Sequence, residues 1–257
     1  MKKIILIVIG VVFLSSCKEE KIEFPEVKTT YKFTQNWDGI DVTKDSFNQI
    51  VFTNANGEKQ SIERLRYLIS RVTLTSNTGV STTMDGYQLI DVSVDSTANF
   101  KPVNLIPVGT YKLSITFGFN QEDNIDGLYK DLNTATWNVP SMLGGGYHYM
   151  QLDGKYLDEL DMEANYNFHS IRAVDKTGAE IAFGKTDFIA ELGEVKIEGD
   201  TNIEIKMDIA EWFKNPHTWN LNELNTMLMP NYNAQKMMSD NGKDAFSLGE
   251  VKLIDGQ

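Results

Sequence analysis

The chain has 257 residues, with 24 Lys and Arg against 36 Asp and Glu, which gives a formal net charge of −12. Apolar residues make up 41% of it, which is enough for a packed core and excludes a chain that is disordered throughout. Its single cysteine excludes a disulfide scaffold and a multi-cysteine zinc or iron–sulfur site. The acidic excess argues against a nucleic-acid partner, because such binding needs a basic face that displaces counterions.

The first residues resemble the secretion signal of a bacterial lipoprotein. Two lysines follow the initial methionine, and an apolar run from Ile4 to Leu14 comes next, too short to span a bilayer as a helix. Small residues then precede Cys17, as in a lipobox. We therefore expect residues 1–16 to be removed and Cys17 to be the lipid anchor. An ordinary signal peptide with an incidental cysteine is the alternative.

A charged segment, residues 17–28, is predicted to be the acylated tether. Its Lys18-Glu19-Glu20 resembles the export signal of surface lipoproteins in the Bacteroidetes. We expect an outer membrane lipoprotein that is held by its N-terminal lipid, on either the periplasmic face or the cell surface. Residues 29–257 are predicted to be one domain, since no repeat or linker divides them.

Short alternating segments dominate this domain and predict an all-β fold, a single β-sandwich. The clearest alternation runs from Gly109 to Phe119, where every second side chain is apolar. The other expected strands are residues 31–34, 47–52, the second half of 65–74, 87–92, 147–152, 166–174, 188–190, 194–197 and 203–208.

Two non-strand regions are expected. Residues 120–146 are polar and without clear periodicity, which predicts a long loop insertion of functional importance or mobility. Near the C-terminus, residues 209–213 fit one helical turn, and residues 222–229 and 232–240 fit short helices. Within the loop, Gly144-Gly145-Gly146 lacks the phosphate-binding pattern and indicates either close backbone passage or a flexible lid.

Five segments in order resemble the copper-binding MbnP-like family, the methanobactin-associated proteins and their lipoprotein relatives. The resemblance covers about residues 28–254 and implies a copper-binding role, with a dihaem cytochrome peroxidase-like protein as partner. The matching pieces are Tyr67–Val72, Tyr87–Asp91, Val108–Phe119, Gly146-Tyr147 with Leu152-Asp153-Gly154, and Phe168-His169-Ser170.

One family motif is altered. Many members carry a methionine and then two tryptophans before the Gly-Tyr pair, and in the best-known relatives an oxidised tryptophan helps to hold copper. Here glycines follow Met142 in place of the tryptophans. Trp137, five residues before Met142, is the candidate aromatic or oxidised site residue.

The three histidines are the candidate metal ligands, because imidazole is the commonest transition-metal ligand. They are His148, His169 and His217, and the resemblance favours His169. None has a second histidine at a local chelating spacing, so the fold must bring them together. Isolated histidines that serve only packing or solvation are the alternative.

These observations predict a non-catalytic cell-envelope lipoprotein that binds or handles copper. The alternative is a surface interaction module without metal, in which the four tryptophans and ten tyrosines bind a glycan or a partner protein. No nucleophile motif such as Gly-x-Ser-x-Gly points to an enzyme. If His148 and His169 lie within about 5 Å and face one cavity, they can share one metal ion.

Overall fold

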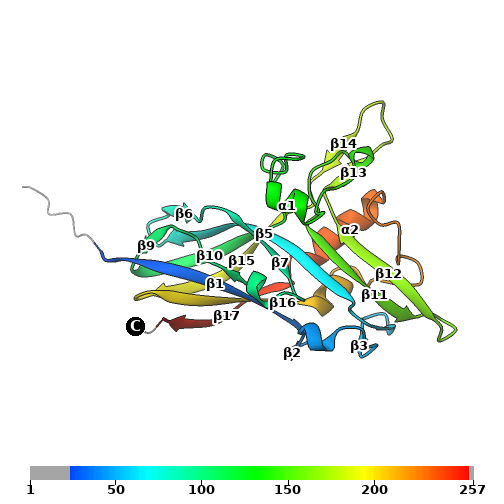
Figure 1. Ribbon diagram of the computed structural model, residues 1–257, viewed down its shortest axis with the longest axis horizontal. Coiled ribbons are helices and arrows are strands. Elements are labelled where there is room, and N and C mark those ends of the chain that lie inside the picture. Colours follow the sequence, from blue (N-terminus) through cyan, green and yellow to red (C-terminus); the bar gives the residue numbers. More distant parts are fainter. Residues whose placement is uncertain (1–23, 255–257) are drawn as a thin grey trace, which may run out of the picture.

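A computed structural model describes residues 24–254, and strands dominate this part of the chain (Figure 1). Its only α-helices are α1 (Lys130–Thr134) and α2 (Tyr232–Gly242). None of the helices among the described residues is long and apolar enough to cross a membrane. The predicted signal peptide and the Cys17 anchor lie outside the described residues.

The first sheet is built around β1 (Glu26–Trp37), which pairs in parallel with β16 (Thr201–Asp208). On the far side of β16 lies the antiparallel β17 (Phe246–Leu253). Three short strands pair with β1: β2 (Ile40–Asp41), β8 (Asn99–Phe100) and β9 (Leu105–Pro107). Because β1 begins at Glu26 and pairs there with β9, the tether predicted for residues 17–28 ends earlier than expected.

The second sheet has the strand order β15-β10-β5-β11-β4-β3, with β6 and β7 also on β5, and β12 on β11. Its long strands are β5 (Arg64–Ser76), β10 (Gly109–Phe117), β11 (Met150–Leu157), β12 (Glu163–Ser170) and β15 (Phe188–Ile197). The short ones are β3 (Phe52–Thr53), β4 (Lys59–Gln60), β6 (Ser81–Thr83) and β7 (Tyr87–Asp91).

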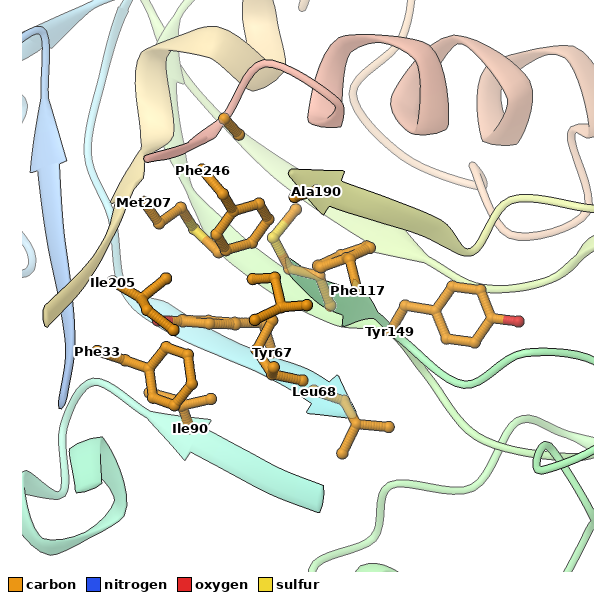
Figure 2. Close-up of a cluster of buried hydrophobic side chains, with 14 of the residues drawn as sticks. Phe33, Tyr67, Leu68, Ile90, Phe117, Tyr149, Ala190, Ile205, Met207 and Phe246 are labelled. Atoms are coloured by element: carbon orange, nitrogen blue, oxygen red, sulfur yellow. The ribbon is translucent and has the colours of Figure 1, made fainter. Parts of the chain in front are cut away.

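The two sheets pack face to face around an aromatic-rich core. Figure 2 shows Phe33, Ile205 and Met207 of the first sheet opposite Tyr67 and Phe117 of the second. Alternation explains this arrangement, because every second residue of a strand points to the same face. The predicted β-sandwich is confirmed.

Remaining elements cover the ends of the sandwich. A separate hairpin joins β13 (Ala173–Asp175) to β14 (Ala182–Gly184). The 3₁₀ turns are η1 (Lys44–Ser46), η2 (Asp95–Ala98), η3 (Ser141–Leu143) and η4 (Ile209–Phe213). Helix α2 holds the end of β12, since the Gln235 side chain bonds to the backbone of both His169 and Ile171.

Several predicted boundaries were wrong. Of the expected strand 47–52 only Phe52 is in a strand, because residues 47–51 form a turn and coil instead. Residues 222–229 form turns, not a helix. The segments 188–190 and 194–197 are one bulged strand, β15, whose register shifts against β10 between Leu113 and Ser114. The long loop 120–146 contains α1 and η3.

Candidate metal site

Polar side chains occupy the face of β5, β11 and β12 that points away from the core. Asp153 of β11 lies opposite Arg64 of β5 and Asn167 of β12, and Gln151 lies opposite Arg66 and His169. The residues between them, among them Leu65, Leu152 and Phe168, are buried in the core. Because neighbouring strands present their side chains in register, this alternation gathers six polar groups on one face.

His169 is oriented by a carboxylate. Its Nε2 lies 2.8 Å from Asp153 Oδ1, while Asn167 Nδ2 donates to the same oxygen at 2.6 Å. Arg64 Nε donates to the second oxygen, Oδ2, at 2.5 Å. Burial alone would raise the pKa of Asp153. The hydrogen bond and charge of His169, the hydrogen bond of Asn167 and the charge of Arg64 outweigh burial and lower this pKa to about 2.

His148 lies just before β11, in a short antiparallel pairing of residues 137–139 with residues 146–148. Its backbone N–H donates to the Trp137 carbonyl oxygen at 3.0 Å, and its Nδ1 lies 3.0 Å from the same oxygen. Burial is the main cause that lowers the pKa of His148 to about 4. The charges of His169, Arg66 and Arg64 lower it further, whereas the hydrogen bond to Trp137 acts in the opposite direction. The ring is therefore neutral at neutral pH.

The two rings are neighbours. Their centroids are 5.6 Å apart, and the ring planes are nearly perpendicular at 84°. A metal held by a ring nitrogen at roughly 2 Å lies about 3 Å from the ring centroid, so two imidazoles on one ion have centroids up to about 6 Å apart. The observed separation is within this limit.

Hydrogen bonding decides which ring nitrogens are free. A backbone carbonyl only accepts, so His148 Nδ1 carries the hydrogen and Nε2 has the lone pair. An ionised carboxylate also only accepts, so His169 Nε2 carries the hydrogen, and the lone pair of the neutral ring is on Nδ1. Metal-binding histidines are commonly held in this way, by a carboxylate or carbonyl on the other nitrogen.

Trp137 forms the inner wall beside His148. Its ring is fully buried, with the centroid 5.5 Å from that of His148. Its Nε1 is buried without a hydrogen-bond partner among the described residues. The Arg66 guanidinium lies over the ring at 5.1 Å and bonds to Gln151 Oε1 at 2.5 Å and to the Ala135 carbonyl at 3.2 Å.

Arg64 and Arg66 also line an open hollow of about 240 Å³, together with side chains from residues 47, 63, 91 and 93. Neither histidine lines this hollow.

The three consecutive glycines let the backbone pass close to neighbouring side chains just before His148. Close backbone passage was one of the two predicted alternatives. All have positive φ, of 87°, 65° and 84° for Gly144, Gly145 and Gly146. A Cβ on them would meet Phe183, Asp126 and Asn124 respectively. Asn124 Oδ1 accepts from the Tyr147 N–H at 2.8 Å, which fixes the residue before His148.

The other predicted residues lie elsewhere. His217 Nε2 is 3.5 Å from Asp240 Oδ2, and its side chain is 38% exposed, so the fold places it at the surface beside Asp240 and not beside the other two histidines. Met142 is 72% exposed on η3. All four tryptophans are buried, which leaves them unsuited to the exposed binding platform that the alternative required.

Sequence reasoning missed the residues that orient the histidines: Arg64, Arg66, Gln151, Asp153 and Asn167. The signal was present as polar residues at alternate positions in three strands, in Arg64-Leu65-Arg66, Gln151-Leu152-Asp153 and Asn167-Phe168-His169. Within residues 24–254, no group of three or more His, Cys, Asp and Glu side chains is arranged to hold a metal ion. The candidate donor set is therefore the histidine pair.

Comparisons with known proteins agree with this architecture. The family model MbnP matches residues 26–233. Among solved structures, MbnP from Methylosinus trichosporium aligns with a TM-score of 0.53 at 11% identity, over 74% of this chain and 78% of that chain. A search of curated proteins found no match. At 11% identity the structural likeness shows a common fold alone. The family model covers most of the residues that the structure describes.

Proposed function

This chain belongs to the MbnP family, and we propose that it is a copper-binding protein whose ligands are His148 Nε2 and His169 Nδ1. Family membership suggests a copper-related role. The observation that carries the proposal is that each ring has one nitrogen held by an acceptor, while the centroids lie 5.6 Å apart.

The donor set favours copper over zinc. Structural zinc sites use four protein ligands and catalytic zinc sites use three, whereas among the described residues no three His, Cys, Asp or Glu side chains are arranged to hold one metal ion. Asp153 is nearby, but it is bonded to the protonated nitrogen of His169. Copper binds imidazole more strongly than the other divalent first-row metals do, and a pair of neutral rings suits it. A blue-copper site is excluded because it needs a cysteine ligand.

Trp137 is the proposed aromatic neighbour of the metal. It lies beside His148 through both its ring and its carbonyl oxygen. In the family resemblance the tryptophan that a dihaem cytochrome peroxidase-like partner oxidises follows the methionine, where this chain has glycines. We propose that Trp137, five residues before Met142 and in contact with His148, takes its place. Such a partner is part of the proposal.

We further propose that the protein is non-catalytic and works in the cell envelope as an outer membrane lipoprotein anchored through Cys17. The alternative, a surface module that recognises a glycan or protein without metal, has less support. It relied on exposed aromatic side chains, and the tryptophans are instead packed in the core.

The test is copper binding by the purified protein, with copper supplied as Cu(I) and as Cu(II) in competition with a chelator of known affinity. We expect one equivalent to bind, and His148→Ala/His169→Ala to lose at least a hundredfold in affinity. His217→Ala is the matched control, because it removes a histidine that is held by Asp240 at the surface. Its affinity should equal that of the wild type.

Thermal unfolding of each metal-free variant checks that the fold survives. If the double variant does not fold, the single variants His148→Gln and His169→Gln keep a polar side chain at each position. Wild-type protein that binds no copper, or a histidine variant that binds as tightly as His217→Ala, overturns the proposal.

A further inference from the structure

A second polar site lies on the other side of Gly144, where the β13–β14 hairpin projects from the sandwich (Figure 1). It is a cavity of about 250 Å³. Its charged walls are Arg172 and Lys185 on the positive side and Asp187 and Glu122 on the negative side, with Phe183 and the amides of Asn120 and Gln121 between them.

Arg172 lacks the partners that a half-buried guanidinium normally has. Within residues 24–254 no ion pair joins Arg172 to a carboxylate, and its Nε is buried without any hydrogen bond. Its one hydrogen bond is a long one, 3.4 Å from a terminal nitrogen to the Gly144 carbonyl. The guanidinium carbon lies over the Phe183 ring, 3.5 Å from its centroid. An arginine has five N–H donors, so most of its capacity is unused.

Phe183 and Gly144 fix this geometry. A Cβ on Gly144 would collide with the Phe183 ring, so only a glycine lets the ring lie against the backbone and support the guanidinium. The planar group is thereby held against the ring, and a guanidinium fixed in this way is suited to binding a carboxylate in bidentate geometry. Burial also lowers the pKa of Arg172, as expected for a cation without a nearby anion.

Asp187 provides the opposite charge. Only 7% of this residue is exposed, and its nearest cation is Lys185 Nζ at 3.7 Å, whose own side chain is 72% exposed. Burial raises the pKa of Asp187 despite Lys185. A buried carboxylate and a half-buried guanidinium thus line one cavity, and no ion pair joins them.

We propose that this cavity binds a free α-amino acid, with the ligand carboxylate on Arg172 and its ammonium group on Asp187. A fixed guanidinium matches a carboxylate in bidentate geometry. The two positive and two negative wall residues favour a zwitterion over a phosphate dianion, which Asp187 and Glu122 would repel. The volume suits a small molecule, and a neutral small polar ligand would leave Arg172 uncompensated.

The test uses the full chain without metal and adds the standard L-amino acids one at a time, with binding followed by calorimetry and by the NMR signal of the Arg172 Nε–H. We expect at least one to bind at millimolar concentration or tighter and to move that signal. The deaminated acid and the decarboxylated amine of the best ligand should each bind at least about tenfold more weakly, because each leaves one charged group unpaired.

Three variants locate the site. Arg172→Met should abolish binding, and Arg172→Lys, which keeps the charge without the fork, should weaken it about tenfold or more. Asp187→Asn should weaken binding of the amino acid but not of the deaminated acid. Lys196→Met, at an exposed pair with Glu198, is the control and should bind like the wild type.

Copper plays no part in this experiment, so its result is independent of the proposed function. The proposal is overturned if no amino acid binds or moves the Nε–H signal. It is also overturned if the best ligand binds no better than its deaminated acid, or if Arg172→Met binds normally. Unfolding of each variant is followed in parallel, and Arg172→Lys keeps the test decisive if Arg172→Met does not fold.

Discussion

Two half-buried arginines each lie over an aromatic ring, but their surroundings differ. Arg66 lies over Trp137 and bonds to Gln151 and to the Ala135 carbonyl. Arg172 lies over Phe183 and has one long bond to Gly144. Burial is the main cause that lowers the pKa of both. Both have an Nε buried without a hydrogen-bond partner among the described residues. The difference is that both terminal nitrogens of Arg66 bond to an oxygen, whereas Arg172 has only the long bond to Gly144.

The rings beneath the two arginines should differ most in stability. Trp137 is fully buried, so Trp137→Ala is expected to cost roughly 3–5 kcal/mol in the free energy of unfolding. Phe183 is 38% exposed, and Phe183→Ala is expected to cost about 1 kcal/mol or less. Denaturant unfolding measures both. Equal losses would contradict the view that one ring belongs to the core and the other to an open cavity wall.

The hydrogen bond between Asp153 and His169 is predicted to strengthen copper binding. Asp153→Asn removes the carboxylate that orients His169, which should lower copper affinity by roughly 10–100-fold. Lys155→Met is the control on the same two strands, because it breaks the exposed pair with Glu163. Chelator competition should show no change for Lys155→Met. An Asp153→Asn affinity equal to the wild type would separate this hydrogen-bonded network from metal binding.

Gly144 should be more sensitive than another glycine with positive φ. Gly127 has φ of 72° with open space around it, so Gly127→Ala tests backbone strain alone, at about 1 kcal/mol. Gly144→Ala adds the collision with Phe183 and should cost roughly 1–2 kcal/mol more. Both are read from chemical unfolding. If the two variants lose the same stability, Phe183 moves aside freely and the arginine is not held.

Asp187 predicts a small pH effect. Its folded pKa is raised above the unfolded value, so its favourable contribution is complete below the unfolded pKa and is lost as pH rises through the folded pKa. Asp187→Asn cannot ionise and should be more stable than the wild type at neutral pH. This advantage should shrink in acid, where the wild-type carboxyl is protonated. Thermal melts of both proteins from acid to neutral pH check the sign. A stability difference between Asp187→Asn and the wild type that does not change with pH would contradict this prediction.

The strands and the sandwich could be predicted because they depend on local pattern. The alternation in residues 109–119 appears directly as β10, whose inward side chains form the core. Predicted strand boundaries were wrong where an alternating stretch has no neighbouring strand to pair with. Residues 47–51 contain apolar residues in a strand-like order, yet no neighbouring strand pairs with them.

The candidate site could be predicted only in part. The histidines were visible as residue types, and the resemblance favoured His169, but nothing local distinguishes His148 from His217. The structure does so through burial and partners: His148 lies against Trp137 and His169, and His217 lies against Asp240. The Arg172 cavity gave no sequence signal, since its walls come from residues 120–122, 172 and 183–187.

The sequence by itself determined the fold class, because alternation acts over a few residues at a time. Five segments in order carried the family resemblance, and the histidines were visible as residue types. Only the tertiary structure decided which of them meet. Strand register places Asp153 between Arg64 and Asn167, and it brings His169 within reach of both Asp153 and His148. Such contacts join residues from 14 to 89 positions apart, and their geometry exists only once the strands have paired.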